Sequence, residues 1–170
     1  MKIPCRVRAV SHFNTLALGV GLWAAASSVM AGSCAVSSNG MAFGSYQPLT
    51  FAGKVTSANV TSSAAVSVVC TGIVTGGSYS IALGPSTPVN SSNPRYLTNT
   101  VNGGANMVFN IYTEASHTSI WGDGISGSLV GGSIPSNQSH TVYGKIPAGQ
   151  STLKAGSFSD SLTMTLTYSP

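Results

Sequence analysis

The strongest constraint on the fold is the last stretch of the chain, residues 158–168 (FSDSLTMTLTY). Its apolar residues Leu162, Met164, Leu166 and Tyr168 alternate with threonines. A period of two gives a β-strand one apolar and one hydroxylated face, so one side is expected to cover a core. The chain ends two residues later at Pro170, so we expect this strand to be the last element of its sheet.

The rest of the composition favours an all-β protein of one domain. Only 6% of the 170 residues are charged, and no sustained helical periodicity follows residue 32. Short apolar or alternating runs separated by Gly, Pro and Asn predict six or seven strands in an antiparallel immunoglobulin-like sandwich. The runs before the last one are residues 34–36, 41–46, 65–70, 79–83, 107–112 and 140–146, and residues 95–97 are a short piece that interrupts a predicted loop. Residues 65–70 and 79–83 are predicted to pair as a hairpin, and the glycine-rich passage 122–132 is predicted to be a loop.

Residues 1–31 have the pattern of a secretory signal. Lys2, Arg6 and Arg8 form a basic start, residues 16–26 form an apolar run, and Ala31 is a small residue suited to signal peptidase. We therefore predict cleavage between Ala31 and Gly32, with residues 32–170 as the mature domain. The alternative is a membrane anchor, but the apolar run is about 11 residues long and a span needs about 20.

Cleavage would change both the charge and the cysteine count. The formal charge of +4 includes three cations of the signal, so the mature chain is nearly neutral and its charge does not indicate nucleic-acid binding. Cys5 would leave with the signal, and Cys34 and Cys70 would remain. Two cysteines in an exported chain predict a disulfide, whereas two ligands without a nearby histidine are too few for a structural zinc site.

The residues that could carry catalysis are few and scattered. They are Glu114, Asp123, Asp160, His117 and His140, and no G-x-S-x-G motif accompanies them. We interpret both histidines as solvated surface residues. Residues 122–127 spell G-x-G-x-x-G, but neither a helix nor an acid about 20 residues later is predicted, so these glycines indicate a turn. The sequence therefore predicts no enzyme activity, no metal and no cofactor.

Several motifs resemble one family. They are, in order, Cys34, FGSY at 43–46, CT at 70–71, RYL at 95–97, IYT at 111–113, IWGDG at 120–124, VYGKIPAGQ at 142–150, AGSFSD at 155–160 and LTY at 166–168. Together they resemble the spore coat protein U domain family, which includes the pilins of archaic chaperone-usher systems. The resemblance spans almost the whole mature chain, and the IWGDG and VYGKIPAGQ blocks are its most specific parts.

The resemblance implies an incomplete immunoglobulin-like sandwich that lacks its final strand. A periplasmic chaperone would lend a strand, an outer-membrane usher would assemble the subunits, and a neighbouring subunit would later complete the fold. The implied walls of this donor-strand groove are Ala35, Val36, Leu162, Met164, Leu166 and Tyr168. The alternative for these residues is an ordinary completed sandwich, in which the chain's own segment would lie between the first and last strands.

The sequence departs from the polymerising members of the family in one respect. Those pilins carry a donor extension of about a dozen residues before the first cysteine, whereas cleavage after Ala31 leaves only Gly32 and Ser33. The chain is therefore expected to accept a strand without donating one, as a tip or minor subunit would. Two alternatives remain: an adhesin that binds through its loops, with Leu129 and Val130 exposed, and a secreted coat or matrix protein that forms no fibre.

Amino-terminal sequencing of the exported protein tests the predicted maturation. We expect the sequence to begin Gly-Ser-Cys, because cleavage follows Ala31. A start a dozen or more residues before Cys34 would contradict the absence of a donor extension.

Overall fold

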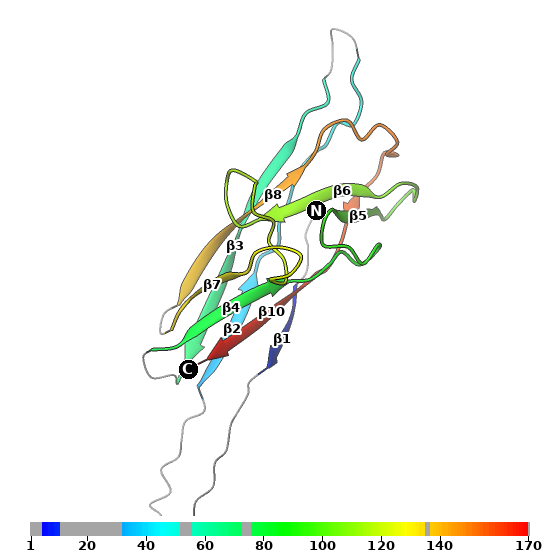
Figure 1. The fold of residues 1–170 in the computed structure, drawn as a ribbon. Helices are drawn as coiled ribbons and strands as arrows, with labels where there is room; N and C mark the ends of the chain where they lie inside the picture. Colours follow the sequence, from blue (N-terminus) through cyan, green and yellow to red (C-terminus); the bar gives the residue numbers. More distant parts are fainter. Residues whose placement is uncertain (1–4, 11–31, 52–55, 73–75, 135–136, 170) are drawn as a thin grey trace, which may run out of the picture.

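The computed structural model describes residues 5–10, 32–51, 56–72, 76–134 and 137–169. These residues form ten strands and no helix, arranged as two packed sheets (Figure 1). The strands are β1 (Cys5–Val10), β2 (Ser33–Ser38), β3 (Val60–Thr71), β4 (Ser78–Leu83), β5 (Arg95–Asn99), β6 (Met107–Tyr112), β7 (Val130–Ser133), β8 (Gln138–Ile146), β9 (Phe158–Ser159) and β10 (Leu162–Ser169). The apolar run 16–26 and Ala31 lie outside the described residues.

The two sheets form the immunoglobulin-like antiparallel sandwich that the sequence predicts. One sheet has the order β1-β10-β4-β7 and the other β2-β3-β8-β6-β5-β9. Neighbouring strands are antiparallel, with one exception: β1 runs parallel to β10.

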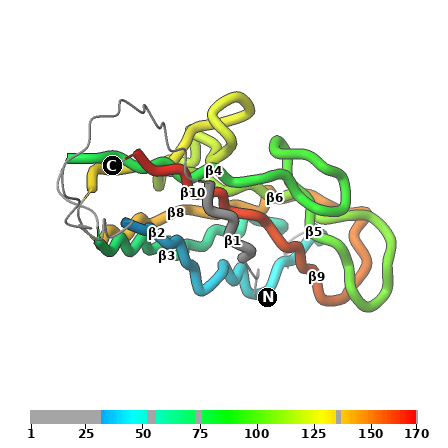
Figure 2. The backbone as a smooth tube through the Cα atoms, turned by 90° about the horizontal axis from the view of Figure 1, so that it is seen from below, coloured from blue at the N-terminus to red at the C-terminus, as the bar shows by residue number. Residues whose placement is uncertain are grey.

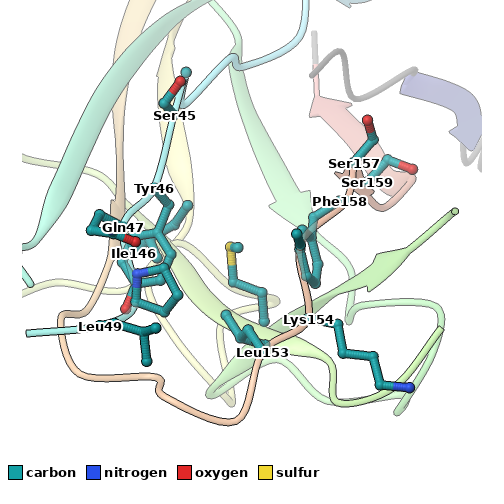
Figure 3. A pocket seen from close by; sticks show the side chains of 15 residues that line it. Ser45, Tyr46, Gln47, Leu49, Ile146, Leu153, Lys154, Ser157, Phe158 and Ser159 are labelled. Atoms are coloured by element: carbon teal, nitrogen blue, oxygen red, sulfur yellow. The ribbon is translucent and has the colours of Figure 1, made fainter. Parts of the chain in front are cut away.

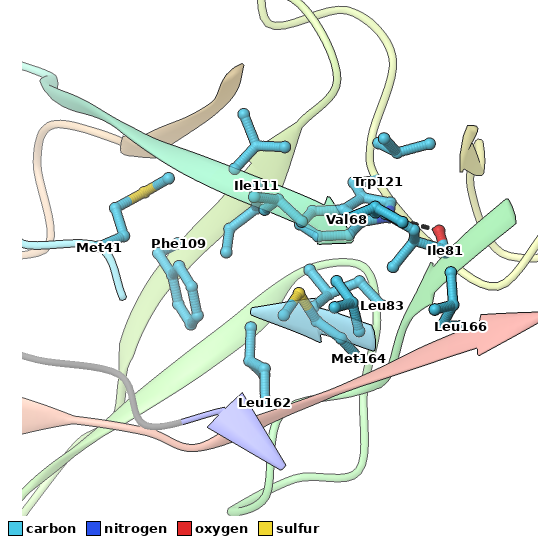
Figure 4. Packing of buried hydrophobic residues seen from close by; sticks show 14 of the residues in the cluster. Met41, Val68, Ile81, Leu83, Phe109, Ile111, Trp121, Leu162, Met164 and Leu166 are labelled. Atoms are coloured by element: carbon cyan, nitrogen blue, oxygen red, sulfur yellow. Dashed lines mark hydrogen bonds between the residues drawn. The ribbon is translucent and has the colours of Figure 1, made fainter. Parts of the chain in front are cut away.

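The core lies between the sheets and follows the alternation of each strand. On β3, Val66 and Val68 are buried while Val69 is exposed, and on β10 Leu162, Met164 and Leu166 are buried. Figure 4 shows Val68 and the three residues of β10 converging with side chains of β4 and β6, together with Trp121. Period-two patterning therefore assigns the core face of these strands correctly.

Arg95 ties the two sheets together at one end of the sandwich. It begins β5 in the six-stranded sheet and is fully buried. Its guanidinium donates to Leu83 O and Gly84 O at the end of β4, to Trp121 O, and to Asn110 Oδ1 on β6, at 2.7–3.1 Å. Burial lowers the pKa of Arg95 to about 10, against the attraction of Asp123 and Asp160, so it stays charged at neutral pH.

Trp121 makes a second tie between the sheets. Its indole Nε1 donates to Ile81 O on β4 at 2.9 Å, the dashed line in Figure 4, and its backbone N donates to Ile111 O on β6 at 2.8 Å. A buried Trp normally finds a partner for its N–H. The IWGDG block therefore has a structural role in this fold.

The VYGKIPAGQ block packs against the core through Gly144 and supports the neighbouring strand through Gln150. A Cβ on Gly144 would lie 2.2 Å from Met41 Sδ and 2.5 Å from Phe43 Cζ, so only glycine fits beside these two side chains. Gln150 donates to Val108 O and accepts from Val108 N, which extends the hydrogen bonding of β6. Tyr46 Oη donates to Pro147 O at 2.8 Å and accepts from Gln150 N.

Three sequence predictions about the strands are wrong. Residues 65–70 and 79–83 do not form a hairpin, because β3 pairs with β2 and β8 while β4 lies in the other sheet. Residues 41–46 form no strand, although Met41 and Phe43 are buried. The glycine-rich passage contains the start of β7, which pairs with β4.

The last stretch is two strands rather than one. β9 pairs with β5 in the six-stranded sheet, and β10 pairs with β4 in the other. The chain changes sheet at Asp160 and Ser161, where the Asp160 carboxylate accepts from Thr87 N at 3.2 and 3.3 Å. The alternation after this break is regular, as predicted.

The histidines are not solvated surface residues, which corrects the sequence interpretation. His117 packs edge-on against Tyr112 and Tyr143, and its Nε2 is buried. His140 Nε2 lies 2.6 Å from Tyr79 Oη, a hydrogen bond from β8 to β4 across the sandwich. Burial lowers the pKa of His140, so the folded state favours its neutral form.

We expect the stability of the protein to fall as the pH drops below about 6.5, the ordinary pKa of histidine. The pKa of His140 is lower when folded, so in this range the unfolded chain binds more protons. Its contribution is complete above pH 6.5 and is lost as pH falls through the folded pKa. Urea midpoints of the full chain at pH 7.5 and 5.5 measure this, and His140→Gln should reduce the difference. An unchanged difference in H140Q would contradict the prediction.

Candidate functional site

The candidate site is the side of the sandwich where β10 and β2 face each other from different sheets. β2 is the edge strand of its sheet, and β10 is separated from the edge of its own sheet only by β1. β1 pairs with β10, and Figure 2 shows β10 in one layer with β2 and β3 in the other. Any segment that covers this side must meet both sheets.

The structure places the predicted groove residues on two different faces. Val36, Leu162, Met164 and Leu166 are buried, and Tyr168 is half-buried. Ala35 is exposed, because alternation along β2 turns it away from the core, so it does not line an inner wall. A small apolar cavity of about 40 Å³ lies between the two walls, bordered by Met41 and Val66 on one side and Leu162 and Met164 on the other.

One end of this side is closed by a contact between β10 and the residue before β2. Tyr168 Oη donates to Gly32 O at 3.2 Å. Gly32 is the residue expected to become the amino terminus after cleavage. The end of the last strand and the start of the predicted mature domain therefore lie together.

The full chain does not leave the edge of β10 vacant, contrary to the sequence expectation that no part of the chain covers it. β1 pairs with β10 in parallel, from Cys5 opposite Leu162 to Val10 opposite Thr167. β1 also lies beside β2. However, Cys5–Val10 falls within residues 1–31, the predicted signal, so an open groove is a prediction for the cleaved chain alone.

A larger groove of about 600 Å³ lies at the other end of the same side (Figure 3). One rim is residues 44–49, which follow β2, and the other is residues 153–159, which lead through β9 toward β10. Met107, Ile146, Leu153 and Phe158 make much of the lining apolar. No acid or histidine lines this groove in the described part of the chain, so it offers no acid-base pair.

The acidic side chains serve local turns. Asp123 Oδ1 accepts from Ser126 N and Ile125 N, which lowers the pKa of this carboxyl, and Gly124 N donates to Gly127 O. The G-x-G-x-x-G sequence is thus a turn, as predicted. Glu114 accepts from Thr118 Oγ1 and Ser119 N, which lowers its pKa. Among the described residues, no three His, Cys, Asp or Glu side chains gather as a metal site.

The disulfide prediction is confirmed. Cys34 and Cys70 are bonded and lie directly opposite each other on β2 and β3. The bond fixes β2, the wall of the candidate site that belongs to the six-stranded sheet.

The family model of the spore coat protein U domain matches residues 22–165. The chain belongs to the spore coat protein U domain family. This match confirms the resemblance seen in the motifs. The chain is also similar to a solved structure, the E. coli Hda pilus minor tip subunit HdaB, with 12% identity, 79% of each chain covered and a TM-score of 0.37. Among curated proteins, none matches the chain.

The motifs that identify the family do not themselves form the candidate site. In this spore coat protein U domain the distinctive motif residues Arg95, Trp121, Gly144 and Gln150 hold the sandwich together. The candidate site is made instead by the ordinary apolar residues of β10, which only their position in the fold distinguishes. Within the described residues, no helix has the length and apolar character needed to cross a bilayer.

Proposed function

We propose that the mature chain is an exported structural subunit of a chaperone-usher pilus or coat-like surface assembly. On this proposal its sandwich is completed by a strand from another protein. The observation that carries the proposal is the edge of β10. Its apolar row is buried between the sheets, and the strand covering its outer edge comes from the predicted signal.

The energetic argument supports the need for a partner. A strand that inserts four or five apolar side chains contributes about 1.5–3 kcal/mol for each, or roughly 6–15 kcal/mol in total. This equals the whole stability of a typical domain. Without such a strand the cleaved chain would also present unpaired backbone groups along β10, which favours aggregation. Strand addition satisfies the backbone and the core together.

The partners follow from this mode of completion. A periplasmic chaperone would hold the subunit, an outer-membrane usher would assemble it, and neighbouring subunits would complete it at the cell surface. Placement at the tip or as a minor subunit rests on cleavage after Ala31, because Gly32 and Ser33 are too short to donate a strand.

A chain beginning at Gly32 tests this proposal when it is produced in the periplasm without a chaperone. We expect aggregation or degradation, and rescue as a soluble monomer by a twelve-residue peptide with alternating apolar side chains. A peptide of the same composition without the alternation is the matched control, because it cannot place its apolar residues on one face. A soluble monomer with a cooperative melt and no added peptide would contradict the proposal.

Direct adhesion is a second candidate, favoured by the loop between Trp121 and β7. Ile125 is 94% exposed and Leu129 is 44% exposed, which is unusual for large apolar side chains on one short loop. Val130 is buried, so the sequence expectation that it is exposed is wrong.

Replacing Ile125 and Leu129 together with serine tests the adhesin candidate. We expect at least a tenfold loss of attachment to apolar surfaces with assembly unchanged, because both side chains are free to touch a surface. Val89→Ser is a matched control on another loop, where the residue is 47% exposed. Unchanged attachment in the double variant would exclude this loop as the adhesive surface.

A further inference from the structure

The strand β7 forms an edge of the four-stranded sheet on the side away from the candidate site. In the sheet order β1-β10-β4-β7, the strand β4 separates β7 from β10 (Figure 1). Within the described residues, no strand pairs with the outer side of β7. A partner at this edge would therefore not compete with a strand added beside β10.

The backbone of residues 128–134 divides its hydrogen-bonding groups between two sides. Ser128 and Ile134 each use both their N–H and their C=O on backbone groups of this chain, and between them β7 pairs with β4. Successive residues of a strand direct these groups to opposite edges. The residues that direct their N–H and C=O toward the open edge are therefore Leu129, Gly131 and Ser133.

This edge lacks the charged side chains that usually keep sheet edges from pairing with other chains. The sequence from Gly124 to Ser139 contains no Asp, Glu, Lys or Arg. Gly131 is exposed and stays without a side chain, because a Cβ there would lie 2.6 Å from Tyr79 O. The open backbone groups are thus accessible to another strand.

The open groups are arranged symmetrically, because Gly131 lies midway between Leu129 and Ser133. An antiparallel copy of this segment would set Gly131 opposite its own equivalent, and Leu129 opposite the equivalent of Ser133. Such a two-fold contact satisfies the same groups on both copies. Three of the seven cations lie in the predicted signal, which leaves four cations against three acids, so two mature copies repel each other little.

We propose that the edge of β7 binds the same edge of a second copy, which joins two four-stranded sheets side by side. The inference goes beyond the proposed function, which concerns the opposite side of the sheet. β7 has only four residues, so the contact between two free copies is small and weak. An assembly that holds copies close together raises their effective concentration and therefore the occupancy of this contact.

Disulfide trapping in the exported protein tests the contact and its register. Leu129→Cys with Ser133→Cys places a thiol of one copy opposite a thiol of the other, within disulfide reach. Both positions are exposed, so the substitutions leave the core intact. The two single variants are the matched controls, because in this register identical positions lie four residues apart, roughly 13 Å.

We expect at least tenfold more covalent dimer from the double variant than from either single variant on non-reducing gels. Peptide mapping should find residue 129 linked to residue 133, with the bond between Cys34 and Cys70 retained. An equal mixture of the two single variants should give the same link between two different chains. Equal dimer yields, no dimer, or a cross-link to a different protein in its place would overturn the inference.

This inference and the proposed function can fail separately. If the link between residues 129 and 133 forms and the chain beginning at Gly32 is stable without a peptide, the lateral contact stands and the partner-strand proposal fails. If the alternating peptide rescues that chain and the double variant gives no link, the lateral contact fails and the proposed function stands.

Discussion

The fold depends on three contacts that β10 must make at once, one through its apolar face and one through each of its two edges. Its apolar face must meet the core, one edge pairs with β4, and the other edge needs a further strand. The first two requirements are met within residues 32–169. The third is met in the full chain by β1, a segment that belongs to the predicted signal.

The rest of the sandwich is built to hold that edge in place. Arg95 and Trp121 join the sheets through backbone carbonyls, so the hydrogen bonds do not require particular side chains on the facing strand. Asp160 holds the point where the chain passes from one sheet to the other, directly before β10 begins. These contacts hold the two sheets together and fix the point where β10 begins.

Local patterning predicted the fold class, the apolar row of β10 and the disulfide, because alternation and cysteine count are properties of short segments. It failed where the outcome depends on distant pairing. The link between residues 70 and 78 looks like a hairpin turn, yet it connects strands in different sheets. Ala35 was misplaced because one residue of phase separates the core face from the outer face. The pairing of Cys5–Val10 with β10 was missed because the basic start was interpreted only as a targeting signal, although its alternation is visible in the sequence.

The bond between Cys34 and Cys70 has a consequence for the edge of the six-stranded sheet. Within the described residues, β2 is a six-residue edge strand that pairs with β3 alone. The covalent link keeps these two strands from separating. The integrity of this edge is therefore tied to thiol chemistry: an oxidising compartment keeps β2 attached, whereas reduction would leave hydrogen bonds and packing alone to hold it.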